Sequence, residues 1–161
     1  MYPAGMHFVY TSVNKTCQRG SGFILKMTVL LFSSELRKAE HQLRQILQGL
    51  GQGVEVYRSI RRFVKRFERP RGDLSLIILL IPNHEILSEL IAMRDQMYDL
   101  PIALMLPDSN RKTILIGHQF YPRFITFTDT DYQDLTLTLQ NIISRDNRLI
   151  NRAIGGNGAV G

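Results

Sequence analysis

The stretch that decides the fold is Asp-Leu-Ser-Leu-Ile-Ile-Leu-Leu-Ile-Pro, at residues 73–82. It is apolar from Leu74 to Ile81 except for Ser75, and Pro82 ends it because proline lacks the N–H that a sheet ladder needs. A short apolar run between breakers is typical of a strand covered on both faces, as in parallel sheets. Residues 102–106, between two prolines, show the same pattern. We therefore expect two central strands of a parallel sheet.

Three further strands are predicted outward from these two, at residues 29–32, 54–57 and 124–127. Segments with helical spacing of apolar residues lie between the strands, at residues 36–50, 60–67, 83–97 and 109–116, and another begins near Asp129 or Thr130. Ser33, Ser34 and Asn83 are candidate helix N-caps, and Gly117 is a candidate helix stop.

Alternating strands and helices predict an α/β fold, a three-layer sandwich with helices on both faces of a five-stranded parallel sheet. The segments 54–57 and 124–127 interrupt their apolar pattern with polar residues, which suits edge strands. With the second and fifth strands at the edges, the expected order is 2-1-3-4-5, as in flavodoxin-like proteins. We expect this domain to span residues 27–145. Residues 1–26 are interpreted as a flexible leader, and residues 146–161 as the end of the last helix and a disordered tail from about Asn151.

Composition narrows the function classes. No apolar run approaches the ~20 residues that a membrane-spanning helix needs, so no membrane association is expected. The chain has one cysteine, Cys17, and four scattered histidines, so we expect no metal site, no cofactor and a reducing, cytoplasmic location. A formal net charge of +6 favours anionic partners.

Three strand ends resemble the receiver domain of bacterial response regulators. Val-Leu-Leu-Phe-Ser-Ser-Glu at residues 29–35 is similar to the first receiver strand, which normally runs into two acidic residues. Residues 73–82 are similar to the third, whose phosphoacceptor Asp lies four residues before the proline. Residues 100–106 are similar to the fourth, which normally finishes at Thr or Ser. The resemblance covers about residues 27–145 and implies a CheY-like receiver fold.

The resemblance also implies a degenerate phosphorylation pocket. Ser33 and Ser34 stand where it implies the acidic pair, Ile78 where it implies the acceptor, and Leu106 where it implies the hydroxyl. The lysine position falls on Phe127, or on Phe124 if the alignment shifts. Phosphoryl transfer needs an Asp nucleophile, carboxylates for Mg²⁺ and a cation for the phosphoryl oxygens. We therefore expect a pseudo-receiver without catalytic residues: a protein interaction module in bacterial signal transduction, outside the phosphorylation chemistry of two-component systems.

A dense run of cations follows the second strand. Seven lie between residues 58 and 71, opposed in that segment by Glu68 alone: Arg58, Arg61, Arg62, Lys65, Arg66, Arg69 and Arg71. We expect an outward basic face that docks an acidic protein partner; a nucleic-acid-associated regulator and a merely solvated helix face are the alternatives.

Other candidates are weaker. Glu35, Asp108 and Asp129 could gather at the carboxyl ends of the strands, although helix capping explains them as well. A small-molecule sensor would use the vacated pocket, lined by Ser33, Ser34 and Asp108. The resemblance implies an output or homodimer face with Tyr121, Tyr132 and Leu135 as candidates. His84 is expected to be an early-helix surface residue.

Overall fold

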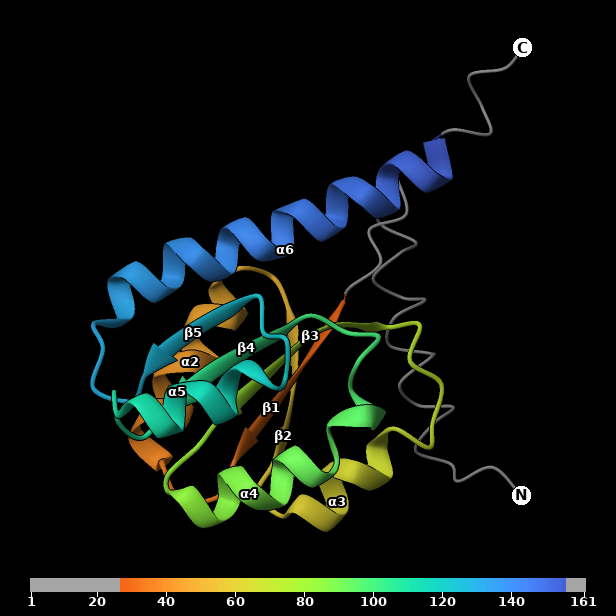
Figure 1. Ribbon diagram of the computed structural model, residues 1–161. Helices are drawn as coiled ribbons and strands as arrows, with labels where there is room; N and C mark the ends of the chain where they lie inside the picture. The colour runs from red at the N-terminus through yellow and green to blue at the C-terminus, as the bar shows by residue number, and fades with distance from the viewer. Residues whose placement is uncertain (1–26, 156–161) are drawn as a thin grey trace.

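The structure is a computed structural model that describes residues 27–155, with side chains described for residues 27–145. The predicted leader at residues 1–26 and residues 156–161 lie outside the described residues. Five parallel strands form one sheet in the order β2-β1-β3-β4-β5 (Figure 1). This confirms the predicted flavodoxin-like order, with β2 and β5 at the edges. The strands are β1 (Thr28–Ser33), β2 (Gly53–Tyr57), β3 (Leu74–Leu80), β4 (Ile102–Leu106) and β5 (Phe124–Phe127).

Helices cover both faces of the sheet. Helices α2 and α6 lie on one face, and α3, α4 and α5 lie on the other (Figure 1). Their bounds are α2 (Arg37–Gly49), α3 (Ile60–Arg66), α4 (His84–Ala92), α5 (Arg111–His118) and α6 (Tyr132–Gly155), with a short 3₁₀ helix η1 (Arg94–Gln96) after α4. Within residues 27–155, no helix combines the length and apolar content that a membrane crossing requires.

Two hydrophobic cores follow from the alternation of side chains along the strands. Leu30 and Ile77 face α3, α4 and α5, whereas Leu31 and Ile78 face α2 and α6. Every residue of β3 is buried, which explains its continuous apolar run.

Helix ends differ in part from the prediction. Asn83 caps α4 as predicted, because its Oδ1 accepts the Ile86 N–H at 2.9 Å. The prediction that Ser33 or Ser34 caps the first helix is wrong: α2 begins after Leu36, whose side chain offers no acceptor. Gly117 does not stop its helix, which continues to His118. Helix α6 runs to Gly155 and so continues past Asn151, where the tail was expected to begin.

Candidate functional site

The carboxyl edge of the sheet is defined by the pairing register of its strands. Ser33 at the end of β1 pairs with Leu80, Leu80 pairs with Met105, and Met105 pairs with Thr126. One position further, Leu106 pairs with Phe127. The predicted site residues Ser33, Leu106 and Phe127 are therefore brought to the same edge, where ligand sites of such sheets form.

Ile78 does not reach this edge. It pairs with Leu31 and Ala103, two residues deeper than Leu80, and is 1% exposed in the core beneath α2 and α6. The assignment of Ile78 to the pocket is thus wrong. It places the end of the third strand four residues before Pro82, whereas β3 continues to Leu80 and only residues 81–83 connect it to α4. Leu80 lies level with Ser33.

The two serines turn inward. Ser33 is fully buried, and its hydroxyl donates a long 3.4 Å hydrogen bond to the Leu36 carbonyl. The Ser34 hydroxyl is also buried and has no hydrogen-bond partner among the described residues. Ser33 therefore bonds within the turn into α2, and the Ser34 hydroxyl has no hydrogen-bond partner among the described residues.

The three carboxylates considered as a cation site lie apart. Asp108 accepts hydrogen bonds from the Asn110 N–H at 2.9 Å and contacts His84 Nε2 at 2.8 Å. Hydrogen bonding from the Thr113 hydroxyl, then from Asn110 and His84, lowers the Asp108 pKa below its usual value. His84 is exposed at the start of α4, as expected. Among the described residues, no three His, Cys, Asp or Glu side chains gather as metal ligands.

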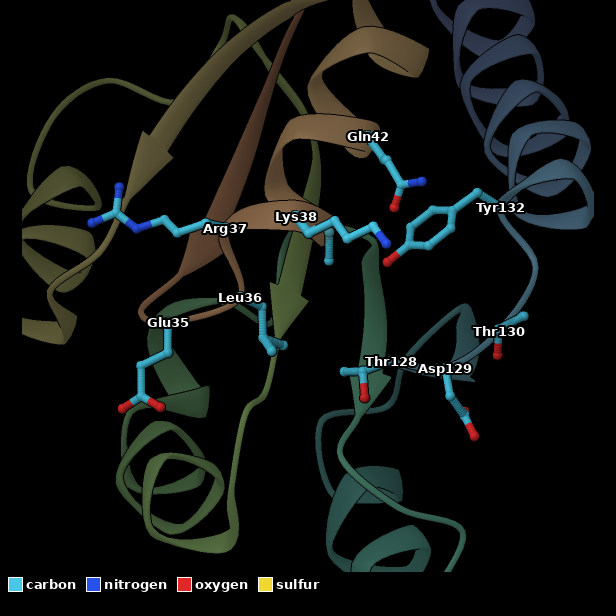
Figure 2. A pocket seen from close by; sticks show the side chains of 10 residues that line it. Glu35, Leu36, Arg37, Lys38, Gln42, Thr128, Asp129, Thr130 and Tyr132 are labelled. Carbon is cyan, nitrogen blue, oxygen red and sulfur yellow. The ribbon is translucent and has the colours of Figure 1, made fainter.

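Glu35 and Asp129 instead border an open pocket between the start of α2 and the β5–α6 connection. The pocket has a volume of about 530 Å³. Lys38 and Gln42 point toward Tyr132 across it, whereas Arg37 points away (Figure 2). Burial raises the pKa of the Tyr132 phenol above its usual value. Ser33, Ser34 and Asp108, the residues expected to line the vacated pocket, do not line this one.

The positive charge of the basic segment after β2 is partly neutralised by acidic residues that lie far away in the sequence. Arg58 bonds to the buried Glu40 of α2 at 2.7 Å, and Arg71 pairs with Asp99 while its guanidinium stacks 5.0 Å over Phe67. Glu68 is therefore not the only opposing charge.

Arg66 is a correction to the predicted outward face. It is 6% exposed and bonds to Glu55 at 2.9 Å, to the Pro70 carbonyl at 3.1 Å and to Asp73 at 3.3 Å. Burial alone would lower the Arg66 pKa, but the hydrogen bond and charge of Glu55 and the charge of Asp73 raise it. Four cations of the basic segment at residues 58–71 stay exposed with no ion pair among the described residues: Arg61, Arg62, Lys65 and Arg69.

The three candidates for an output face differ in how exposed their side chains are. Tyr121 is 89% exposed, but Leu135 is 2% exposed in the core, so Leu135 is wrong as a surface residue. Tyr132 is half-buried beside the pocket. Sequence reasoning missed Glu40, Glu55, Asp73 and Asp99 as partners of the cations, since partners up to 28 positions apart leave no local pattern.

Comparison with known proteins rests on structure alone. No family model matches the chain, and no curated protein is similar to it in sequence. A response regulator from Thermotoga maritima is similar at a TM-score of 0.61 and 16% identity, covering 74% of this chain and 99% of that one. A two-component response regulator from Clostridium difficile gives 0.62 and 14%, covering 76% and 99%.

The signal receiver domain of an HD domain-containing protein from Pseudomonas fluorescens Pf-5 gives 0.62 and 16%, covering 76% and 98%. Each of these TM-scores exceeds 0.6, and nearly the whole of each neighbour is covered. The chain therefore has the fold of response-regulator receiver domains.

Proposed function

We propose that this chain is a non-catalytic, receiver-like module that works in signal transduction through contacts with a protein partner and without phosphorylation of an Asp. The observation that carries the proposal is which residues the strand pairing places side by side at the carboxyl edge of the sheet. Leu80 of β3 lies there beside Ser33 of β1. A receiver would need a carboxylate at the end of β3, and residues 74–81 contain none.

The neighbouring positions support the same reading. Ser33 is buried and turned to the backbone, so it offers no carboxylate to Mg²⁺, which prefers hard anionic oxygens. Leu106 and Phe127 lie at the ends of β4 and β5, where the receiver resemblance implies a hydroxyl and a cation. Phosphoryl transfer depends on positioned charge, and these apolar side chains supply none.

The test is treatment of the full chain with Mg²⁺ and acetyl phosphate, with a phosphorylatable receiver treated in parallel. We expect no acid-labile phosphoryl adduct in the mass spectrum and no saturable amide NMR shifts at Ser33, Leu80 or Leu106. Appearance of the adduct, mapped to a carboxylate of this chain, would overturn the proposal.

A further inference from the structure

We propose that the outer edge of β2 binds an extended acidic segment of a partner protein, which pairs with β2 as an added strand between the basic side chains of α2 and α3. The inference rests on the proposed function, because it takes the partner to be a protein. It names the surface, the binding mode and the chemistry of that partner.

The edge of β2 has backbone groups to offer. Gly53 donates its N–H to the Met27 carbonyl of the neighbouring strand at 2.9 Å. Bonding direction alternates along a strand in a parallel pair, so Gly53, Glu55 and Tyr57 face β1, and the N–H and C=O of Val54 and Val56 point away from the sheet. No hydrogen bond to these outward groups is found among the described residues. All five residues of β2 are partly exposed.

The strand at the opposite edge of the sheet bonds to the turn that follows it. In β5, the Phe127 N–H donates to the Thr130 hydroxyl at 3.3 Å, and Thr126 donates its own hydroxyl to the same oxygen at 2.8 Å. The Thr130 side chain therefore ties the end of β5 to the turn before α6. Nothing comparable covers Val54 or Val56 within residues 27–155.

Cations border the β2 edge on the α2 side. The 2.7 Å bond between Arg58 and Glu40 shows that α2 reaches the segment that follows β2. Arg37 and Arg44 lie three residues before and four residues after Glu40, so they share its side of the helix. In Figure 2, Arg37 points away from Lys38 and from the pocket.

Cations also border the edge on the α3 side. Arg66 reaches Glu55 of β2, and Arg62 lies one helical turn before Arg66 on the same side. The positive charge of Arg69 acts on the hydroxyl of Tyr57 in β2. Arg37, Arg44, Arg62 and Arg69 are all exposed and have no ion pair among the described residues.

An added strand would meet these cations on both of its faces. Side chains of a strand alternate between the two faces of the sheet, so one set would lie toward α2 and the other toward α3. Both sets would need carboxylates to match the arginines, whereas the strand backbone would pair with Val54 and Val56. A second copy of the chain would bring the same cations to the edge, and like charges repel. Nucleic acid could use the cations but not the backbone groups of the edge.

The probe is the capped seven-residue peptide Glu-Glu-Val-Val-Glu-Glu-Val, which as a strand carries Glu on both of its faces, titrated into the full chain and followed by amide NMR. We expect saturable shifts at Val54 and Val56 and slower amide hydrogen exchange there. The matched peptide Lys-Lys-Val-Val-Lys-Lys-Val should leave these amides unchanged. Shifts that map only to the pocket beside Tyr132 or to α5 would overturn the inference.

Two variants separate the backbone from the charges. Val56→Pro removes the outward N–H while leaving every cation in place, and binding should weaken about tenfold or more. The double variant Arg37→Glu, Arg62→Glu should weaken binding by about as much. Its matched control, Arg111→Glu with Lys112→Glu on α5, makes the same change in net charge away from the edge and should keep affinity within about twofold.

Several outcomes would contradict this mode. A folded Val56→Pro variant with unchanged affinity would exclude strand addition. If that variant does not fold, unchanged affinity in the double arginine variant would show that the arginines beside β2 do not bind the peptide. Binding of a DNA duplex with no response to the Glu–Val peptide would assign the cations to nucleic acid. Phosphorylation by acetyl phosphate would overturn the proposed function but would not alter this peptide titration.

Discussion

Arg66 of α3 donates a hydrogen bond from Nε to Glu55 Oε2 of β2 over 2.9 Å, and the same carboxylate oxygen accepts the Tyr57 hydroxyl at 2.8 Å. The guanidinium also reaches Asp73 before β3, so one buried cation joins α3, β2 and the start of β3. This relationship divides the basic segment into one buried cation, Arg66, and the exposed cations around it.

Replacing Arg66 with Ala should destabilise the fold by about 2 kcal/mol, measured by urea unfolding. The cost stays below the ~3–5 kcal/mol of fully buried pairs, because the Glu55 and Asp73 side chains are 38% and 48% exposed and remain hydrated. Arg62→Ala is the matched control, since Arg62 is exposed, and should change stability by less than about 0.5 kcal/mol. Equal effects in the two variants would contradict the internal role of Arg66.

Tyr57 should titrate abnormally late. Burial, and then the hydrogen bond and charge of Glu55, raise its pKa from 10.0 to about 12. The unfolded chain therefore loses this proton at lower pH than the folded chain, so the contribution to stability is complete below pH 10.0 and is lost as the pH rises toward about 12. Ultraviolet titration should show a phenol that ionises near pH 12 and that Tyr57→Phe removes. A Tyr57 that ionises with the exposed tyrosines would refute the burial argument.

Gly117→Ala should destabilise the protein by about 1–3 kcal/mol in thermal or urea unfolding, because α5 packs too closely on β4. A Cβ atom at Gly117 would lie 3.0 Å from Leu104 Cδ2 and 3.2 Å from Leu106 Cδ1. Gly49→Ala in α2 is the control, since nothing lies within 4 Å of its added Cβ, and it should stabilise by about 0.5–1 kcal/mol. A neutral Gly117 variant would show that the two leucines can move aside.

Tyr121→Gly should stabilise the fold by up to about 1 kcal/mol. Tyr121 has a positive φ of 51°, which is unfavourable for a side chain with a Cβ, and it is 89% exposed, so little packing is lost. Tyr98→Gly provides the comparison, because Tyr98 is 84% exposed without a positive φ and should lose stability instead. Chemical unfolding of both variants decides the matter; a loss of stability in both would mean that Tyr121 makes contacts that offset its backbone strain.

Asp108 should protonate at lower pH than an ordinary Asp. Its pKa is lowered first by the Thr113 hydroxyl, then by the Asn110 N–H and His84. A depressed folded pKa means that the stabilising contribution is present above the unfolded value of 3.8 and is lost as the pH falls through the folded pKa. Carboxyl carbon NMR should locate this titration, and Thr113→Val should move it upward. No change in Thr113→Val would assign the shift to Asn110 and His84.

Local sequence patterns were enough to predict much of the fold. The apolar run at residues 74–81 identified a central strand because strands covered on both faces need apolar side chains at successive positions. Polar interruptions in 54–57 identified an edge, and Asn83 identified a helix start because its side chain accepts an N–H three residues on. Each of these signals depends on residues close together in the chain.

The site depended on relationships that the sequence does not display. Ile78 was expected at the carboxyl edge, but the pairing register places Leu80 there, and register is set by how three strands pack together. Arg66 was expected to face outward, but Glu55 and Asp73 draw it inside.

By itself, then, the sequence determined the strands, their order and the absence of a carboxylate within residues 74–81. Only the tertiary structure decided which residue lies beside Ser33, which cations remain unpaired, and that Val54 and Val56 turn their backbone groups outward at the β2 edge. The physical reason is that hydrophobic periodicity is a local property of the chain. Strand register and ion pairing arise between segments that meet only when the chain is folded.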